Sequence, residues 1–376
     1  MKKGPVHCPG MSRRDFLRTV GAAAAGWLVG GCRPQEPVQT QEPAPTPTAT
    51  AVVPPLPRVA IAHAASYDRT LIRQQVRGLL DTLGGLGDVV RSGDRVAIKV
   101  NLTGGTGVKP LPGVSAIDSY ITHPEVVQAL GELVRDAGAR EVLIVEAAYE
   151  WESYRRWGYE EVAEALGATL IDLNATQPYN DFATTPVGEG WYIYKDFTFN
   201  HVLEEVDAFI SVSKMKCHWS CGVTHTMKNL VGLVPARFYR LNPEDNYRSA
   251  FHGQEDEMGT RLPRVIMDLN RARPIHLGLI DGIKTTEGGE GPWIETLAPL
   301  EPGVLIAGKD PVATDAVATA AMGFDPTANP PAAPFLRSDN HLNLARELGL
   351  GTNRLDEIEV VGLSIADVRR EFKPCW

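Results

Sequence analysis

From residue 58 onward, short runs of apolar, often β-branched residues alternate with longer stretches in which apolar positions recur every three to four residues. The short runs are typical of buried strands, and the longer spacing is typical of helices that bury one face. The runs predict strands at 59–62, 95–100, 141–145, 169–172, 208–213, 276–280, 304–307 and 357–361. The longer stretches predict helices at 69–83, 124–137, 160–166, 223–234, 263–271, 311–322 and 365–372. This alternation indicates an α/β fold, with a largely parallel sheet flanked by helices in Rossmann-like halves.

Three stretches interrupt the alternation. Residues 101–121 are rich in Gly and Pro, residues 174–200 carry many aromatic side chains, and residues 235–262 are polar. In α/β folds, long loops that follow strand ends usually build the functional site, so these stretches are expected to form a cleft. The alternative is that they pack as surface excursions.

The first 57 residues show no such alternation and predict an export signal. Arg13 and Arg14 precede a short apolar stretch that ends at Gly30-Gly31-Cys32, which resembles a bacterial twin-arginine signal followed by a lipobox. The apolar stretch covers about 12 residues, whereas a membrane-spanning helix needs about 20. We therefore expect residues 1–31 to be a cleaved signal peptide, with lipid attached to the sulfur of Cys32.

A tether is expected to follow the lipid. Residues 33–57 contain eight prolines together with many Thr and Gln, a composition that forms an extended spacer rather than a core. The expected organisation is a lipidated Cys32 within a Pro/Thr-rich tether at 32–57 and a globular domain at 58–376. The twin-arginine export machinery would deliver the protein, and the lipid would anchor it to the outer face of the bacterial cytoplasmic membrane or the cell surface.

Composition and charge narrow the classes of function. A hydrophobic content of 43% excludes a disordered chain. The 37 basic and 46 acidic residues give a net charge of −9. Because affinity for nucleic acid depends on clustered basic charge, no nucleic-acid partner is expected. Against this background, the 36 residues between Asp207 and Glu244 contain no acid, where the average acid content would place about five. Such a segment attracts anions.

The acid-free segment contains a candidate anion site. A strand at 208–213 leads into a loop, and a helix is expected to begin near Gly222. The free amides of a helix N-terminus and nearby lysines bind phosphate or carboxylate well. The alternative is a solvated basic helix face. The candidate side chains of this segment are Lys214, Lys216, Thr224, Lys228 and Asn229.

The same segment contains a candidate metal site. Cys217, Cys221 and His225 recur at intervals of four residues, and His218 completes a ligand set for zinc or another soft metal. Gly222 argues against a single helix through all four. A disulfide between Cys217 and Cys221, or two small buried thiols, are the other interpretations. The identity of any cofactor stays open.

A Gly-rich acidic stretch follows the strand at 276–280. Its carboxylates, Asp281, Glu287 and Glu290, could act as general bases or hold a divalent cation, or they could be solvated side chains of an ordinary turn. Farther on, Asp315 stands among apolar residues of a predicted helix. A buried carboxylate needs a partner, and Lys99 or Lys214 is expected to supply it.

We expect the strand ends to bring these groups into one cleft, because Lys99 and Asn101 end the strand at 95–100. An anionic substrate would be held there by Lys99, Asn101, Lys214, Lys216, Thr224, Lys228 and Asn229. The catalytic groups would be His218, His225, Glu290 and Asp281.

Several motifs, in this order, resemble the domain of unknown function 362 family. They are Lys99-Val-Asn101-Leu102, Thr122-His123-Pro124-Glu125, Lys214-Met-Lys216-Cys-His218 with Lys228-Asn229-Leu230, Asp281-Gly282 with Glu290-Gly291-Pro292, and Asp315-Ala316-Val317. The resemblance covers nearly all of 58–376, and its most specific part is the Lys-x-Lys-x-His to Lys-Asn block. Some members carry four-cysteine iron–sulfur motifs, which this sequence lacks, so a ferredoxin-type cluster is not expected. The resemblance implies where the site lies and leaves the reaction open.

Three functions therefore compete. The first is a lipid-anchored enzyme that acts on a small anionic substrate. The second is a metal- or redox-cofactor protein built on Cys217, Cys221, His218 and His225. The third is a non-catalytic solute-binding lipoprotein, for which a tether and a cleft suffice.

Overall fold

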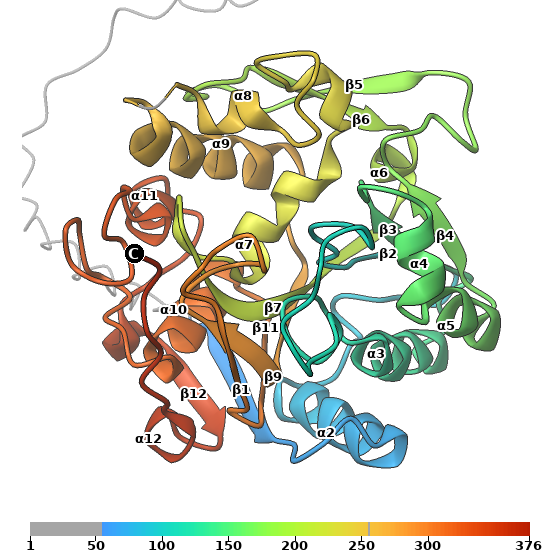
Figure 1. Ribbon diagram of the computed structural model, residues 1–376. Coiled ribbons are helices and arrows are strands. Elements are labelled where there is room, and N and C mark those ends of the chain that lie inside the picture. Colours follow the sequence, from blue (N-terminus) through green and yellow to red (C-terminus); the bar gives the residue numbers. More distant parts are fainter. Residues whose placement is uncertain (1–54, 255) are drawn as a thin grey trace, which may run out of the picture. The chain divides into compact units, whose positions relative to one another are not determined.

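A ten-stranded sheet runs through residues 55–254 and 256–376, the part of the chain that the computed structural model describes (Figure 1). The predicted signal peptide and nearly all of the predicted tether lie outside these residues. The strands of this sheet are β1 (Arg58–His63), β2 (Arg95–Lys99), β3 (Glu141–Glu146), β4 (Thr169–Asp172), β7 (Ala208–His218), β8 (Gly222–Val223), β9 (Leu277–Glu287), β10 (Ala298–Leu300), β11 (Val304–Gly308) and β12 (Glu359–Gly362). A separate two-stranded sheet contains β5 (Phe182–Pro186) and β6 (Asp196–Asn200).

The topology of the large sheet is mostly parallel. Its main path has the order β12-β1-β11-β9-β7-β2-β3-β4, while β8 and β10 extend β7 and β9 as antiparallel partners. Along the main path, β11 is antiparallel to both of its neighbours, β1 and β9, and the other described pairs are parallel. The predicted α/β fold with a largely parallel sheet is confirmed.

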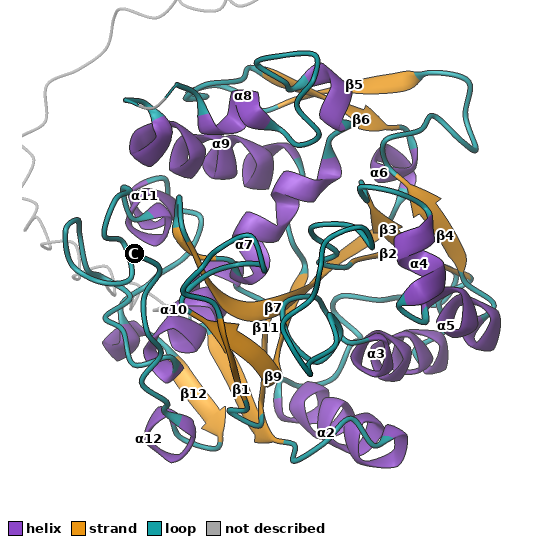
Figure 2. Cartoon of the chain, viewed as in Figure 1, coloured by secondary structure: helices purple, strands orange, loops and turns teal. Residues whose placement is uncertain are grey.

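Helices cover both faces of the sheet (Figure 2). The α-helices are α2 (Arg69–Thr82), α3 (Pro124–Asp136), α4 (Glu152–Arg156), α5 (Tyr159–Leu166), α6 (Val202–Glu205), α7 (His225–Lys228), α8 (Ser249–His252), α9 (Met258–Ala272), α10 (Pro311–Ala321), α11 (His341–Glu347) and α12 (Ile365–Val368). The 3₁₀ helices are η1 (Asn229–Leu233), η2 (Ala236–Phe238) and η3 (Leu355–Glu357). Along β2, Val96 and Ile98 pack toward α2 and α3, whereas Ala97 packs into the core that contains α9 and α10. Successive strand residues thus supply two separate cores.

Each of the eight predicted strands is present, but two are longer than predicted. β7 continues to His218 rather than 213, and β9 continues to Glu287 rather than 280. The sequence argued against both extensions because lysine and aspartate are rarely buried in strands. Lys214, Lys216 and Asp281 are therefore strand residues and not loop residues, and this changes their role.

The helix predicted at 223–234 is wrong at its start. Gly222 has a φ of +79° and pairs with His218 across the β7–β8 hairpin, so the chain is still extended there. The short helix α7 follows, and η1 continues it with 3₁₀ geometry. Of the three irregular stretches, 174–200 contains the β5–β6 hairpin, 235–262 contains η2, α8 and the start of α9, and 101–121 has no helix or strand.

Candidate functional site

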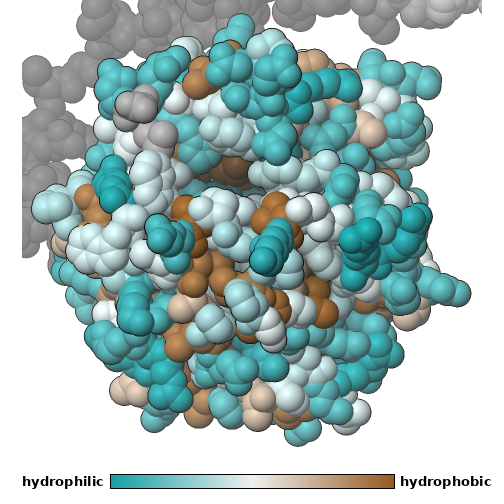
Figure 3. All heavy atoms as spheres, viewed as in Figure 1, coloured by the Kyte–Doolittle hydropathy of each residue, from teal (hydrophilic) through white to brown (hydrophobic). Residues whose placement is uncertain are grey.

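A cavity of about 450 Å³ lies where β2, β3 and β7 end. On the face shown in Figure 3, the surface is hollowed below the α8–α9 layer and apolar side chains lie at the base of the hollow. Six residues expected at the site line the cavity: Lys99, Asn101, His218, Lys228, Asn229 and Glu290. The lining residues that we did not predict include Glu146, Tyr149, Tyr247, Arg248, His252 and Trp293.

An ion pair between the ends of two neighbouring strands forms part of the wall. Lys99 ends β2, Glu146 ends β3, and Lys99 Nζ lies 2.9 Å from Glu146 Oε2. The ammonium also donates to Val100 O at 2.6 Å and to Asn229 Oδ1 at 3.2 Å. Burial lowers the pKa of Lys99 to about 8 and raises the pKa of Glu146. Because all three N–H groups of Lys99 have acceptors, this lysine shapes the wall and has no donor left for a ligand.

Lys99 also fixes the orientation of two amides. An ammonium only donates, so the atom of Asn229 that faces it must be the oxygen. Asn101 Nδ2 donates to the same oxygen at 3.1 Å. The oxygen of Asn101 is left buried and without a hydrogen bond to any described residue. Both asparagines thus stand at the wall as predicted, with Asn229 held by protein groups and Asn101 only partly satisfied.

Two cationic groups at the cavity have unfilled hydrogen-bonding capacity. Lys228 ends α7, is half-buried, and makes no hydrogen bond or ion pair with the described residues. Arg248 donates through Nε and Nη2 to Val234 O, and through Nη2 to Ala147 O, at 2.9–3.1 Å. Its Nη1 has no partner within 55–254 and 256–376. Burial lowers the pKa of Lys228 and of Arg248.

Glu290, by contrast, is already bonded. Its Oε1 accepts from Trp293 Nε1 at 3.0 Å, and its Oε2 accepts from the Trp219 backbone N–H at 2.9 Å. Because each oxygen of this carboxylate holds a donor, Glu290 is fixed in place and poorly placed to abstract a proton. The cavity, with cations that have unfilled donors and a carboxylate that is already hydrogen-bonded, is suited to a negatively charged ligand.

His218 lies at the end of β7, in the turn of the β7–β8 hairpin. Its Nδ1 accepts from the Ser220 N–H at 3.2 Å. Burial and the nearby Lys228 lower the pKa of His218 well below its ordinary value, so the imidazole is neutral. Because Nδ1 is the acceptor, the proton is on Nε2, and His218 is a hydrogen-bond donor. His252 lines the same cavity, and burial lowers its pKa to about 4.

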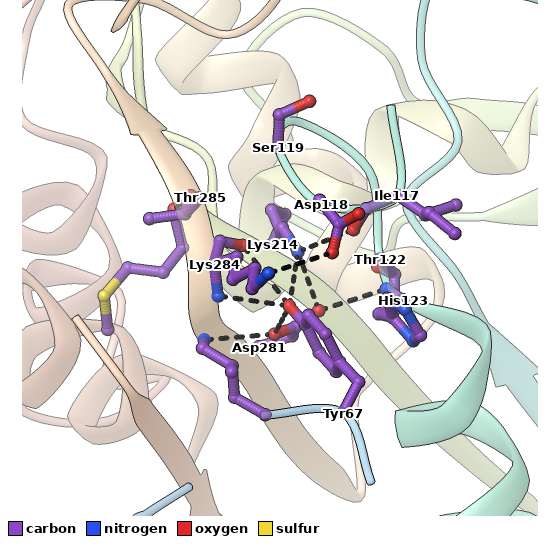
Figure 4. A network of polar contacts seen from close by, with 12 residues as sticks. Tyr67, Ile117, Asp118, Ser119, Thr122, His123, Lys214, Asp281, Lys284 and Thr285 are labelled. Atoms are coloured by element: carbon purple, nitrogen blue, oxygen red, sulfur yellow. Dashed lines mark hydrogen bonds and ion pairs between the residues drawn. The ribbon is translucent and has the colours of Figure 1, made fainter. Parts of the chain in front are cut away.

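Lys214 and Asp281 belong to a different network (Figure 4). The two are fully buried, with Lys214 Nζ 2.9 Å from Asp281 Oδ2. Tyr67 OH donates to Asp281 Oδ1 at 2.8 Å and accepts from Lys214 at 3.0 Å. The His123 N–H donates to Asp281 Oδ2 at 3.0 Å, and its ring stacks on Tyr67 with centroids 3.6 Å apart. The network is closed and does not line the cavity.

Strand register explains why the expected single cleft of Lys99, Lys214 and Asp281 does not form. Lys99 pairs with Ser211 of β7, and Lys214 lies three residues farther along that strand. An odd separation places a side chain on the opposite face of a sheet. The expectation that these groups meet is therefore wrong. Lys216 is also buried away from the cavity wall, and it donates to Tyr120 O at 2.6 Å and to Glu290 O at 3.0 Å.

The expected anion site at the helix N-terminus is filled by the protein itself. The backbone N–H groups of Thr226 and Met227 each donate to the Asp315 carboxylate at 2.9 Å. Asp315 thus caps α7, and its predicted pairing with Lys99 or Lys214 is wrong. Thr224 and His225 are fully buried and do not line the cavity. The Nε2 atom of His225 lies 3.2 Å from Met322 Sδ. The backbone φ of His225 is 43°.

The four expected metal ligands do not converge. Cys217 and His218 are successive strand residues, so their side chains point to opposite faces. The Cys217 thiol donates to Lys373 O at 3.3 Å and the Cys221 thiol to Val223 O at 3.4 Å. Both are free thiols, not a disulfide. Within 55–254 and 256–376, no group of three or more His, Cys, Asp or Glu side chains is arranged to hold a metal ion.

The predicted acidic cation site does not form either. Glu287 pairs with Lys373, with Oε1 and Nζ 3.1 Å apart. Asp281 is held by Lys214 and Glu290 by two tryptophans, so the three carboxylates have separate partners.

The buried thiols are expected to resist alkylation. Burial raises the pKa of Cys221 and of Cys375 to about 12 and raises that of Cys217 as well, and thiols react as thiolates. Iodoacetamide at pH 8 should leave all three unmodified in the folded protein and modify all three in guanidinium chloride. Peptide mass spectrometry measures this directly. Rapid modification of Cys217 or Cys221 in the folded protein would contradict the described packing.

His341 is expected to make stability depend on pH. It is fully buried, and burial lowers its pKa to about 4. Between pH 6.5 and 4, the unfolded chain binds a proton that the folded protein excludes, so stability falls as the pH falls. From pH 7 to 5, the wild type should lose about 2 kcal/mol more unfolding free energy than His341→Gln. Urea denaturation of both proteins at the two pH values tests this, and equal losses would contradict it.

No helix in the described part of the chain has the length and apolar content needed to cross a membrane.

Comparisons with known proteins place this chain in a family. A family model described as "Domain of unknown function (DUF362)" matches residues 96–320. A thylakoid-associated protein of Synechocystis sp. is 28% identical over 281 residues, which cover 72% of this chain and 76% of that protein.

Two solved structures are similar at 11% identity. The lactate racemase apoprotein from Thermoanaerobacterium thermosaccharolyticum matches 66% of this chain and 54% of its own, with a TM-score of 0.36. A protein from Thermotoga maritima matches 66% of this chain and 57% of its own, with a TM-score of 0.32. The chain thus spans little more than half the length of these structures, and at these scores they do not bear on the ligand.

Proposed function

The chain belongs to the DUF362 family, and we propose that its cavity binds a small anionic ligand with a carboxylate or phosphate group. The observation that carries this proposal is Lys228, a cation in the cavity wall without a partner among the described residues. Arg248 lines the same cavity, and its Nη1 has no partner among the described residues. The acids of the wall are already engaged, Glu146 by Lys99 and Glu290 by Trp293 and Trp219.

The energetics favour an anion. A cation taken out of water without a partner is costly, and the lowered pKa of Lys228 reflects that cost. A bound carboxylate or phosphate would offset it through charge-assisted hydrogen bonds from the ammonium and the guanidinium. A neutral ligand of the same shape would gain nothing from either group. Anion binding should therefore be accompanied by proton uptake at pH values where part of Lys228 is deprotonated.

A panel of ligands tests the proposal. Thermal unfolding would be followed with mono- and dicarboxylates and phosphate esters, each beside its primary amide or neutral ester. At least one anion should stabilise the fold, by about 3 kcal/mol at one hundred times its Kd, while its neutral analogue should not. Rising salt should weaken the binding. If anions and neutral analogues stabilise equally, or no anion binds, the proposal is wrong.

We further propose that the protein is an enzyme in which His218 donates a hydrogen bond from Nε2 to the ligand and stabilises negative charge that develops there during the reaction. Of the four expected catalytic residues, His218 and Glu290 line the cavity, and both oxygens of Glu290 hold donors. A neutral imidazole with its proton on Nε2 can polarise a ligand as a hydrogen-bond donor while keeping that proton, and its Nδ1 is already occupied by the Ser220 N–H. Proton NMR of the ligand incubated with the protein should show turnover that His218→Phe abolishes. Recovery of the ligand unchanged would instead favour the solute-binding lipoprotein.

Export and lipid attachment are proposals from the sequence pattern at Arg13, Arg14 and Cys32, which lie outside the described residues. Replacing both arginines with lysine should leave the uncleaved precursor in the cytoplasm. Replacing Cys32 with alanine should release the exported protein from the membrane fraction. Membrane retention of the Cys32→Ala variant would rule out the lipid as the anchor.

A further inference from the structure

Three exposed aromatic side chains surround the cavity. Tyr149, Tyr247 and Trp293 all line it, yet 38%, 42% and 45% of their surfaces are exposed. They come from three separate segments, which follow β3, η2 and β9. Large aromatic residues are usually mostly buried, and a cluster of exposed ones marks a binding surface more often than an isolated one does. The deeper wall, formed by His218 and Asn229, is almost fully buried.

The indole of Trp293 is held in a fixed position. Its Nε1 donates to Glu290 Oε1 at 3.0 Å, and Tyr120 packs edge-on to it with centroids 6.4 Å apart. A Cβ added at Gly104 would lie 2.7 Å from the indole, and one added at Gly291 would overlap it. The ring therefore occupies space that only these glycines leave free. A ring fixed in this way, on a residue that is 45% exposed, can contact a ligand without first losing conformational entropy.

The cavity is larger than an anionic group requires. A volume of about 450 Å³ is within the range that encloses a drug-sized molecule, whereas a carboxylate or phosphate group alone would leave most of it empty. Lys228 and Arg248 provide the charge, and the aromatic residues provide apolar, planar surface. Because the cations and the aromatic side chains line the same cavity, one ligand can contact both.

We infer that the ligand is an aromatic acid, with its planar ring against Trp293 and its carboxylate or phosphate at Lys228. This inference rests on the proposed anion binding and adds the chemistry of the rest of the ligand. Stacked aromatic rings attract each other beyond the effect of buried area alone. Tyr149 and Tyr247 would cover the remaining edges of the ring.

Isothermal titration calorimetry with four simple probes tests the inference on the folded protein. Benzoate and phenyl phosphate carry the ring, and acetate and inorganic phosphate carry the same charged group without it. Each aromatic probe should bind at least fivefold more tightly than its partner. Cyclohexanecarboxylate, which is equally apolar but not planar, should bind more weakly than benzoate.

Two variants localise the effect. Trp293→Leu should remove the advantage of benzoate over acetate, and the ratio of the two Kd values is the readout because loss of the indole N–H also frees Glu290 Oε1 and can change both. Trp191→Leu is the matched control, because Trp191 is 48% exposed and does not line the cavity, and it should retain the advantage. Equal affinity for benzoate and acetate in the wild type, or an advantage that survives Trp293→Leu, would overturn the inference and leave anion binding intact. If none of the probes binds, both proposals fail.

Discussion

Asp281→Ala is expected to lower the free energy of unfolding by about 3–5 kcal/mol, the loss typical of removing one partner from a buried ion pair. Asp281 and Lys214 are fully buried, with their charged atoms 2.9 Å apart. The carboxylate also accepts hydrogen bonds from Tyr67 OH and the His123 N–H. Its removal leaves Lys214 charged and unpaired, or forces it to lose its proton. Urea denaturation at pH 7 measures the loss.

Two further variants show whether the ion pair is the cause. Lys214→Met combined with Asp281→Leu should recover part of the loss, because no unpaired charge then remains in the core. Asp356→Ala removes an exposed ion pair with Arg354 and should change stability by less than about 1 kcal/mol. A loss for Asp281→Ala no greater than that for Asp356→Ala would show that the network does not stabilise the fold.

Lys228→Met is expected to weaken binding of an anionic ligand by at least about 30-fold, since removing one member of a desolvated charge pair costs 2 kcal/mol or more. Lys228 has no protein partner within the described residues, so the substitution breaks no ion pair, and it should leave the stability of the free protein unchanged or raise it. Methionine keeps most of the apolar length of lysine. Calorimetry with the best anion of the panel gives the two dissociation constants.

The matched control for this prediction is Lys195→Met. Lys195 is an exposed lysine with 74% of its side chain accessible, and it does not line the cavity. Its replacement changes the net charge by the same amount and should alter affinity less than twofold. Lys228→Arg should retain much of the affinity. Unchanged binding by Lys228→Met would mean that the anion, if it binds, is held elsewhere.

The strands were predictable because buried apolar runs depend on local sequence alone. What sequence could not supply was the length of β7 and β9, since Lys214, Lys216 and Asp281 are stable inside a strand only through partners far away in the chain. The same long-range partners decide the site. Lys228 and Asn229 line the cavity because α7 follows the β7–β8 hairpin back over the strand ends, whereas Lys214 faces the other side of the sheet.

The missed residues had weaker signals. Glu146 directly follows the strand predicted at 141–145, where side chains at strand ends commonly line a site. Trp293 directly follows the Gly-rich acidic stretch, and Arg248 lies within the polar segment 235–262. Each position was close to a feature already noted. Whether each of these residues lines the cavity depends on which loops meet over the sheet, and a single sequence does not contain that information.

The position of β1 has a consequence for the order of events during synthesis. Both neighbours of β1 in the sheet, β11 and β12, come from the far end of the chain. Pairing over such a separation forms late, because the intervening chain must be closed into a loop first. The ribosome releases an arginine pair at residues 13 and 14 long before Gly362 can pair with Ile61. If the proposed export signal at this arginine pair is read only on folded protein, it must remain unread, or shielded, until translation is complete.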